Sequence, residues 1–307
     1  MYLIIGGFAM DLISFRDLDK GTVEKIFGIA EDIDRQLERK KVEKLEGIMA
    51  TLFFEPSTRT KLSFQSSAER LGLQVVDFLA DRSSLKKGES FTDTIKTVDG
   101  YCDIMAMRHP AEGAARLAAE VAEAPVLNGG DGANQHPTQT LLDLYTIRKL
   151  KGKIAGLNIH LVGDLKHART MHSLVYGLGM FGAKVTMVAP KGLELEEHMV
   201  HEAEKRFNFK MESRDSIDLK DADVLYVCRV QEERFIDKYE AAKVKKEFTI
   251  SADYIRKGKK DLIIMHPLPK IDEIPPEVDA MPQAKYFEQA RNGIPVRMAC
   301  IKMLLEG

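Results

Sequence analysis

Short apolar runs alternate with longer amphipathic segments along almost the whole chain. In the first half the run Ile104–Met107 is continuously apolar and Ile48–Phe54 is apolar except for Thr51, which is typical of strands buried on both faces. Strands separated by helical segments indicate βαβ units, in which helices cover parallel strands. The other strands expected in this half are Val75–Leu79 and Pro125–Leu127, and the expected helices are Thr60–Leu71, Phe91–Gly100 and Glu112–Ala122.

The same alternation returns in the second half of the chain. Met171, Leu174, Val175 and Leu178 repeat at the spacing of one helical face. The strands expected here are Leu157–Gly163, Ala183–Ala189, Ala222–Cys228 and Leu262–Met265. The pattern therefore predicts an α/β protein of two domains, each with a mainly parallel β-sheet flanked by helices.

The helix that begins at Pro137 is the expected boundary between the two domains. Proline favours the first position of a helix, where its missing N–H would have no partner anyway. A chain of 307 residues also suits two domains of about 150 residues each. We expect a first domain at residues 1–136 and a second at residues 137–289. A last helix, patterned over Arg297–Leu305 within about 290–307, is expected to pack back on the first domain.

Composition and charge narrow the classes of function. The formal net charge is -2, so the bulk charge does not favour nucleic acid or an anionic membrane as a partner. No apolar run approaches the ~20 residues that span a bilayer, and the apolar stretch Met1–Ala9 lacks the basic start of a secretory signal. Cys102, Cys228 and Cys300 lie far apart, which indicates free thiols in a reducing compartment. We therefore expect a cytoplasmic protein with no disulfide framework, no metal site and no cofactor.

The segment Gly177–Gly182 fits the G-x-G-x-x-G pattern of dinucleotide-binding proteins. Such a site requires a strand before the glycines and a helix after them. Here the helical pattern precedes the glycines and an apolar strand follows them, so the order is reversed. The segment therefore predicts the end of a helix and no nicotinamide site.

The segment Phe54–Thr60, FEPSTRT, follows a buried strand and opens a helix. Unpaired N–H groups at a helix start attract anions, and Ser57 and Thr58 are suited to cap that start. Arg59 adds a planar fork that fits two phosphate oxygens. These donors favour a phosphate site, although a capped helix with a solvent-facing arginine has the same spacing.

Polar residues at two other element ends extend this pattern. Arg108 ends a strand, at the edge where open α/β sheets bind ligands, and His136 and Gln139 lie in the opening turn of one helix. With FEPSTRT, these segments resemble the aspartate/ornithine carbamoyltransferase family in order and spacing, over about residues 53–297. The segments that carry the resemblance are Phe54–Thr60, Met107–Pro110, Asn128–Gly132 and Gln135–Thr140.

The resemblance implies a carbamoyl phosphate site in the first domain. The catalytic residues that it implies are Arg59, Thr60, Arg108 and His136. The residues that it implies for binding carbamoyl phosphate are Ser57, Thr58, Arg59, Thr60, Arg108, His136 and Gln139. Among them, Thr60, Arg108 and His136 would polarise the carbamoyl carbonyl, and Gln139 would bind the carbamoyl NH2.

The polar segment Ser83–Glu89 is, on its own composition, a solvated surface turn. It resembles the family's loop that enters the active site of the neighbouring subunit in a homotrimer. This resemblance implies that Ser83 and Lys87 contact carbamoyl phosphate and that Lys87 also contacts the second substrate. Ser84 is the alternative serine, because it precedes leucine as the family's serine does.

The two acceptor substrates of this family, aspartate and ornithine, differ in charge, so the charges in the acceptor site distinguish them. Aspartate brings two carboxylates and requires two cations, whereas ornithine brings one carboxylate and a second ammonium. Arg169 and Arg229 follow expected strands, although a solvated charged turn would also account for the run from Arg229. A basic residue early in a helix opposes the helix dipole, so Arg169 is misplaced unless it serves a ligand.

GDLxxxRT and RVQxER are similar to motifs of the family's aspartate branch. They imply that Arg169, Arg229 and Gln231 bind the substrate carboxylates and that Glu233 orients Arg229. Leu268 stands where the ornithine branch has cysteine, and the carbonyls of Leu268 and Pro269 would steer the amine.

The expected reaction transfers the carbamoyl group of carbamoyl phosphate to aspartate, giving N-carbamoyl-L-aspartate and phosphate, a step of pyrimidine biosynthesis. The alternatives are transfer to another amine such as ornithine, or a non-catalytic protein that binds anions or amino acids. The retained polar set of Arg59, Thr60, Arg108, His136 and Gln139 favours an enzyme over a binding protein. The resemblance further implies a homotrimer with shared active sites and allows zinc-binding regulatory chains as partners in an allosteric complex.

Overall fold

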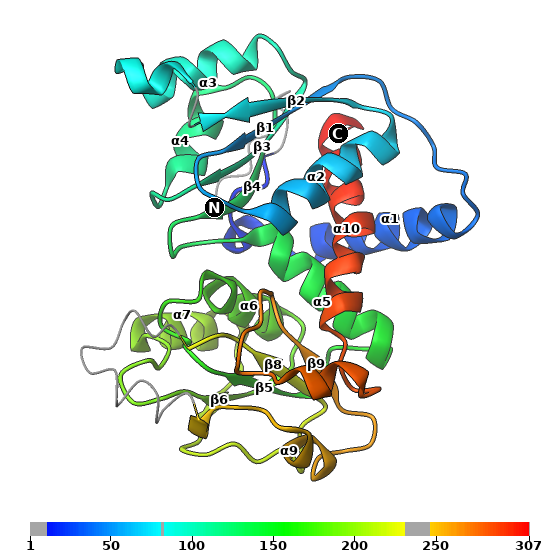
Figure 1. The fold of residues 1–307 in the computed structure, drawn as a ribbon, viewed down its shortest axis with the longest axis vertical. Coiled ribbons are helices and arrows are strands. Elements are labelled where there is room, and N and C mark those ends of the chain that lie inside the picture. Colours follow the sequence, from blue (N-terminus) through cyan, green and yellow to red (C-terminus); the bar gives the residue numbers. More distant parts are fainter. Residues whose placement is uncertain (1–10, 81–82, 231–245, 307) are drawn as a thin grey trace. The chain divides into compact units, whose positions relative to one another are not determined.

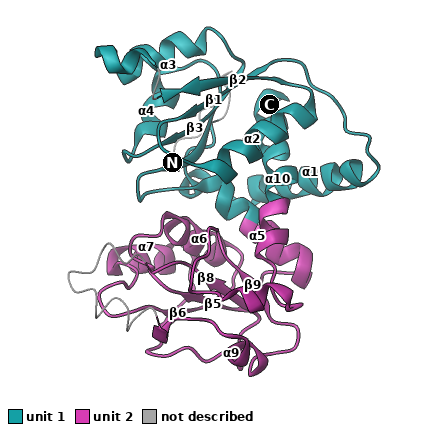
Figure 2. Cartoon of the chain, in the orientation of Figure 1, with its two compact units in different colours: residues 1–142, 292–307 teal, residues 143–291 magenta. Residues whose placement is uncertain are grey.

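The computed structural model describes residues 11–80, 83–230 and 246–306. The chain forms two compact units, unit 1 with residues 1–142 and 292–307 and unit 2 with residues 143–291 (Figure 2). The division falls inside helices α5 (Pro137–Lys151) and α10 (Tyr286–Glu306). The boundary expected before Pro137 is the start of the first of these helices.

Unit 1 contains a four-stranded parallel sheet in the order β2-β1-β3-β4 (Figure 1). Its strands are β1 (Ile48–Phe53), β2 (Gln74–Leu79), β3 (Ile104–His109) and β4 (Val126–Asp131). The helices are α1 (Lys20–Glu38), α2 (Thr58–Leu71), α3 (Phe91–Asp99) and α4 (Ala114–Val121), with 3-10 turns η1 (Phe15–Asp17) and η3 (Ser84–Lys87). One face of the sheet packs on α3 and α4 through a core that includes Leu52, Met107 and Ala118. On the other face α2 lies close enough for Gln65 to donate a hydrogen bond to Thr51 over 3.2 Å.

Unit 2 contains a five-stranded parallel sheet in the order β7-β6-β5-β8-β9. Its strands are β5 (Asn158–Val162), β6 (Lys184–Val188), β7 (Met211–Ser213), β8 (Val224–Val227) and β9 (Ile263–Met265). Its helices are α6 (Arg169–Met180), α7 (Glu197–Phe207) and α9 (Ala252–Arg256), with the 3-10 turn η5 (Pro276–Ala280). The core beside the sheet includes the strand residues Val162, Val227 and Ile264, all at most 1% exposed.

The predicted fold class is confirmed, because both sheets are parallel and both are flanked by helices. The expected start of the last helix at Arg297 is wrong. Helix α10 begins at Tyr286 and continues through Pro295, a residue that normally interrupts a helix. Packing offsets this disruption, since Arg297 donates to Ser63 over 2.7 Å and the Ser67 hydroxyl donates to the Ile294 carbonyl over 3.3 Å.

The glycines of Gly177–Gly182 end helix α6, as predicted. The Gly182 and Ala183 N–H groups donate back to the carbonyls of Gly179 and Leu178, and Gly182 has a φ of +68°. A Cβ at Gly179 would lie 2.6 Å from the Phe209 ring, so this position requires glycine for packing. No helix in the described part of the chain is long and apolar enough to cross a membrane.

His160 is a buried titratable residue in the middle of the unit 2 sheet. It lies on β5 between Thr186 of β6 and Leu225 of β8, and its side chain is 0% exposed. Burial lowers the pKa of His160 below 6.5, although Nε2 lies 3.4 Å from the Asp221 carboxylate, which acts in the opposite direction. The imidazole is therefore neutral in the folded protein near neutral pH.

This burial makes stability depend on pH with a definite sign. A histidine whose pKa is lowered by folding binds its proton more readily in the unfolded chain, so stability falls as pH drops below about 6.5. We expect His160→Phe to reduce the loss of unfolding free energy between pH 7.5 and pH 5, measured by urea denaturation. His198→Phe is the control, because the His198 side chain is 70% exposed and its replacement should leave the loss unchanged. Equal losses in the wild type and His160→Phe would contradict the assignment.

Candidate active site

The start of α2 presents donors to an open part of unit 1. Ser57 is the N-cap residue, and its carbonyl accepts a hydrogen bond from the Lys61 N–H over 3.2 Å. The expectation that the Ser57 side chain caps the helix is wrong, because its hydroxyl makes no capping hydrogen bond. Thr58 and Arg59 are exposed. Although Arg59 is exposed, neighbouring atoms shield part of its guanidinium from water and so lower its pKa, and the group stays charged at neutral pH.

A hollow of about 610 Å³ opens beside this helix start. It has room for a small phosphorylated compound, and the first N–H groups of a helix favour negative charge. It is lined by Phe53, Phe54, Glu55, Pro56, Ser57, Thr58, Lys61, Phe78, Leu79 and Ala80.

Arg108 is held at the carboxyl end of β3 by an ion pair. The parallel register of β1 and β3 pairs Phe53 with Arg108, which brings the two strand ends together. Glu55, two residues beyond Phe53, accepts a hydrogen bond from Arg108 Nε over 2.6 Å, and the two side chains are only 21% and 17% exposed. Sequence reasoning missed Glu55, and its place between the strand and the phosphate motif was the only signal for it.

His136 and Gln139 come to the same unit on the first turn of α5. The His136 carbonyl accepts hydrogen bonds from the N–H groups of Gln139 and Thr140 over 3.0 and 3.2 Å, and the two site residues are 3% and 9% exposed. Gly129, at the end of β4, lies so close to neighbouring segments that a Cβ would be 3.0 Å from the Met107 carbonyl and 3.5 Å from Thr60 Cγ2. The backbone of β4 therefore packs directly against the end of β3 and the start of α2.

The loop that holds Ser83 and Lys87 forms the turn η3 at the surface of unit 1. The Ser83 hydroxyl donates to the Ala80 carbonyl over 2.8 Å, and the Ser84 hydroxyl donates to the Glu89 carboxylate. Lys87 is exposed. Among the described residues around the hollow beside α2, neither Ser83 nor Lys87 forms part of the lining.

In unit 2 the ends of β5 and β8 meet at a glycine. A Cβ at Gly163 would lie 2.1 Å from the Cys228 carbonyl oxygen, so only glycine allows this approach. The Cys228 thiol donates to the Asp164 carbonyl over 3.1 Å, and burial raises the pKa of this thiol well above its ordinary value. The contact fixes the residue before Arg229 beside the loop that leads into α6.

The two arginines expected to bind aspartate start from these strand ends. Arg169 is the first residue of α6, and Arg229 lies two residues after the end of β8. Both side chains are partly buried. Asp164 shapes the loop before Arg169, because its carboxylate accepts the His167 N–H over 3.0 Å. Gln231 and Glu233 lie outside the described residues.

The segment from His266 to Pro269 forms a constrained turn after β9. Leu268 has a φ of +57°, in a region that disfavours residues with a Cβ, and its bond to Pro269 is cis. Its N–H donates to His266 Nδ1 over 2.8 Å, and His266 Nε2 lies 2.9 Å from the Glu273 carboxylate. This turn sets the direction of the Leu268 and Pro269 carbonyls.

A buried polar network supports this turn from within unit 2. The Gln289 side chain accepts the His266 N–H over 2.8 Å and donates to Asp143 over 2.7 Å. Tyr226 donates its hydroxyl to the second Asp143 oxygen over 2.8 Å, and burial raises the pKa of this phenol. Sequence reasoning missed Asp143 and Gln289, since they are far apart in the chain and share no motif.

The described residues bring oxyanion donors together in unit 1. The start of α2, Arg108 and the first turn of α5 supply amide, guanidinium and imidazole groups at neighbouring strand ends. Such groups stabilise a phosphate or a carbonyl oxygen on which charge develops. Within residues 11–80, 83–230 and 246–306 no group of three His, Cys, Asp or Glu side chains is arranged to hold a metal ion.

Two family models cover nearly the whole chain. Residues 10–149 match the aspartate/ornithine carbamoyltransferase, carbamoyl-P binding domain. Residues 155–304 match the aspartate/ornithine carbamoyltransferase, Asp/Orn binding domain.

Individual proteins resemble this chain over almost their full length. The aspartate carbamoyltransferase catalytic subunit of Methanopyrus kandleri is 50% identical over 301 residues, 97% of each chain. The solved catalytic subunit of M. jannaschii aspartate transcarbamoylase has a TM-score of 0.91 at 49% identity, covering 96% of this chain and 98% of that one. Aspartate transcarbamoylase from Trypanosoma cruzi, in complex with N-(phosphonacetyl)-L-aspartic acid, has a TM-score of 0.91 at 38% identity, covering 96% and 95%.

The approach at Gly163 gives a direct test of how the second strand end is built. We expect Gly163→Ala to lower the free energy of unfolding in urea by about 2 kcal/mol more than Gly182→Ala, because its Cβ would collide with the Cys228 carbonyl. Gly182 is the matched control, since its φ is also positive but a Cβ there meets nothing within 4 Å. Similar losses for the two variants would show that the approach at Gly163 is not required.

Proposed function

Because the chain belongs to the aspartate/ornithine carbamoyltransferase family, we propose that it transfers the carbamoyl group of carbamoyl phosphate to L-aspartate. The products are N-carbamoyl-L-aspartate and phosphate. The observation that carries the proposal is the pairing of Arg108 with Glu55, because Glu55 lines the hollow beside the helix start at Ser57 and so holds a cation next to it. The relatives at about half identity are named as this enzyme, which supports aspartate as the acceptor.

Unit 1 is proposed to bind the donor. The helix start at Ser57 and Thr58, together with Arg59, would hold the phosphate. Thr60, Arg108 and His136 would donate to the carbamoyl oxygen and Gln139 would bind the NH2 group. In the reaction the amine of aspartate forms a C–N bond with the carbamoyl carbon and the C–O bond to phosphate breaks. The amine proton passes to the leaving phosphate, so no protein base is assigned.

This set of residues would act by electrostatics and positioning. Charge grows on the carbamoyl oxygen as the amine attacks, and donors already fixed in place stabilise it without reorganising. Arg108 is suited to this role because Glu55 restrains it on one side. Holding both substrates also converts a bimolecular encounter into a positioned one.

Unit 2 is proposed to bind the acceptor. Arg169 and Arg229 supply the two cations that two carboxylates require, and Gln231 is proposed as a further ligand. The carbonyls of Leu268 and Pro269 would steer the amine. Ornithine is disfavoured, because its side-chain ammonium would meet the second arginine.

An assay of the purified chain tests this proposal. Carbamoyl phosphate and L-aspartate should give carbamoyl-aspartate in a colorimetric assay, whereas ornithine should give no carbamoylated product. Product from ornithine, or none from aspartate, would reject the proposal.

Arg229→Ala sharpens the same test. Loss of a charged hydrogen bond of about 1.5–3 kcal/mol should raise the KM for aspartate roughly 10- to 150-fold, with a smaller change in the KM for carbamoyl phosphate. Arg256→Ala is the control, because Arg256 pairs with the exposed Asp253 on α9. Equal effects on both substrates would refute the division of roles between the units.

We further propose that the chain forms a homotrimer with shared active sites. The edge strand β2 leaves the apolar side chains of Val76 and Leu79 46% and 51% exposed, and an uncovered apolar edge invites pairing with another chain. Leu79 also lines the hollow beside α2, so a second copy on this edge would lie next to the phosphate site. The η3 loop would then bring Ser83 and Lys87 to the neighbouring site. Zinc-binding regulatory chains and a cytoplasmic setting stay predictions.

The oligomer proposal predicts the effect of charge on the β2 edge. Val76→Lys with Leu79→Lys should convert the trimer to monomers in sedimentation velocity and abolish most activity, while circular dichroism stays unchanged. Tyr101→Lys is the control. Tyr101 is 65% exposed, but it lies before the amino end of the central strand β3 and not on the β2 edge. A double variant that stays trimeric, or a wild type that is monomeric, would contradict the proposal.

A further inference from the structure

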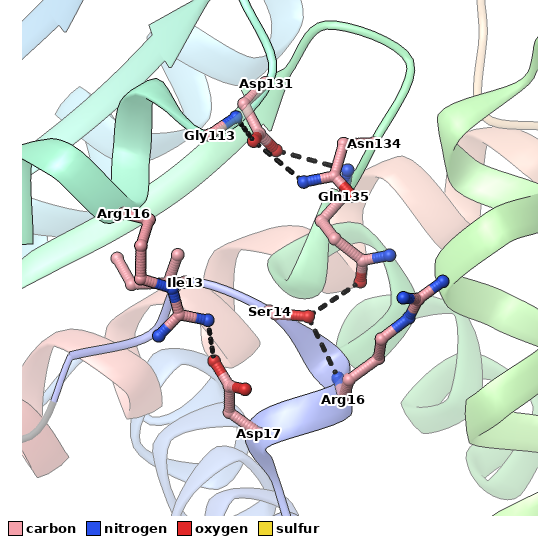
Figure 3. A pocket seen from close by; sticks show the side chains of 9 residues that line it. All are labelled: Ile13, Ser14, Arg16, Asp17, Gly113, Arg116, Asp131, Asn134 and Gln135. Atoms are coloured by element: carbon pink, nitrogen blue, oxygen red, sulfur yellow. Dashed lines mark hydrogen bonds and ion pairs between the residues drawn. The ribbon is translucent and has the colours of Figure 1, made fainter.

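Asp131 is a buried carboxylate at the end of β4 whose role the sequence motifs left unassigned. It is 1% exposed, and Figure 3 shows it next to Gly113, Asn134 and Gln135. Its oxygens accept hydrogen bonds from Gly113 N (2.8 Å), Asn128 Nδ2 (2.8 Å), Asn134 Nδ2 (3.0 Å) and Gln135 N (3.2 Å).

These four hydrogen bonds use the full acceptor capacity of the Asp131 carboxylate. Oδ1 accepts from Asn128 and Gln135, and Oδ2 accepts from Gly113 and Asn134. Each oxygen has two lone pairs, so four donors occupy them all. A buried group satisfied in this way holds its partners in one arrangement.

The partners of Asp131 connect two segments that lead to the site. Gly113 is the last residue of the connection from β3, which carries Arg108, to helix α4. Gln135 immediately precedes His136. Backbone hydrogen bonds add to this link, because the Asp131 N–H donates to the Gln135 carbonyl over 3.2 Å and the Gly132 N–H donates to the His109 carbonyl over 3.0 Å. One side chain therefore fixes the spacing between the strand end with Arg108 and the turn with His136.

A second layer of contacts keeps this arrangement rigid. Ser14 donates its hydroxyl to the Gln135 side-chain oxygen over 3.1 Å, and Asn128 donates to the Ile13 carbonyl over 2.9 Å (Figure 3 shows the first of these). Asn128 also accepts the Gly130 N–H over 2.8 Å. The loop from β4 to α5 is thus tied to the start of the described chain as well as to the segment after β3.

We propose that Asp131 is a positioning residue for the carbamoyl transfer, acting through His136 and Arg108. The inference rests on the proposed function, because it assigns Asp131 to the two groups that would polarise the carbamoyl oxygen. Asp131 itself touches neither substrate. It fixes the orientation of the Arg108 and His136 side chains.

Asp131→Asn tests the proposal with almost no change in shape. An asparagine offers one oxygen and an NH2 group, so two of the four donors would face another donor. His136 and Arg108 should then lose their alignment while the start of α2 still binds phosphate. We expect kcat to fall about 100-fold, the scale of losing one fixed oxyanion donor, with a smaller change in the KM for carbamoyl phosphate.

Asp11→Asn is the control for a merely structural effect. Asp11 accepts the N–H of Val126, at the opposite end of β4, over 2.8 Å, so its loss perturbs the same strand away from the site. Asp11→Asn should lower the melting temperature without lowering kcat more than threefold. An equal loss of kcat in both variants, or a kcat for Asp131→Asn within threefold of the wild type, would overturn the proposal.

A milder variant decides the matter if Asp131→Asn does not fold. Asn134→Ala removes one of the four donors and should lower kcat about 3- to 10-fold, whereas an unchanged kcat would count against Asp131. The NMR titration of the His136 ring separates this inference from the proposed function. The titration curve of His136 should change in Asp131→Asn and stay unchanged in Asp11→Asn. This result is expected even if the wild type shows no carbamoyl transfer. An unchanged curve in both variants would overturn the inference.

Discussion

Parallel strand pairing is the constraint on which the candidate binding residues of each unit depend. It places the carboxyl ends of neighbouring strands at one edge, so side chains far apart in sequence start from adjacent points. In each unit a glycine tightens this edge. Gly129 brings β4 against the end of β3, and Gly163 brings β5 against the end of β8. The polar residues that follow these strands are therefore placed by the backbone before any ligand binds.

Buried and half-buried carboxylates then orient the polar side chains that the strands place. Glu55 restrains Arg108, Asp131 holds the turn before His136, and Asp143 supports the turn at Leu268 through Gln289. Each accepts hydrogen bonds from elements distant in the sequence, and each would leave unsatisfied donors if it were lost. The position of the ligand-facing donors thus depends on a set of acceptors that lie behind them.

The sequence was informative where local chemistry determines structure. Continuous apolar runs predicted the central strands, and the helix start at Ser57 and the strand end at Arg108 were visible as motifs. The sequence was uninformative where contacts between distant segments determine the local structure or the role of a residue. Strand β7 has three residues with mostly polar character, and helix α10 continues through Pro295 where Arg297 donates a hydrogen bond to Ser63 of α2. Asp143 has no local signature, since Tyr226 and Gln289 are far from it in the chain, and the link from Asp131 to Gly113 is likewise invisible in the sequence.

Unit 1 is assembled from two separate stretches of the chain, with all of unit 2 between them. The stretch after residue 292 is integral to unit 1, because Arg297 stacks over the Phe64 ring at 4.9 Å and donates to Ser63. Unit 1 therefore lacks part of its sequence until all of unit 2 has been synthesised. Completion of the first domain before the second is synthesised, which is usual for successive domains, is therefore not open to unit 1.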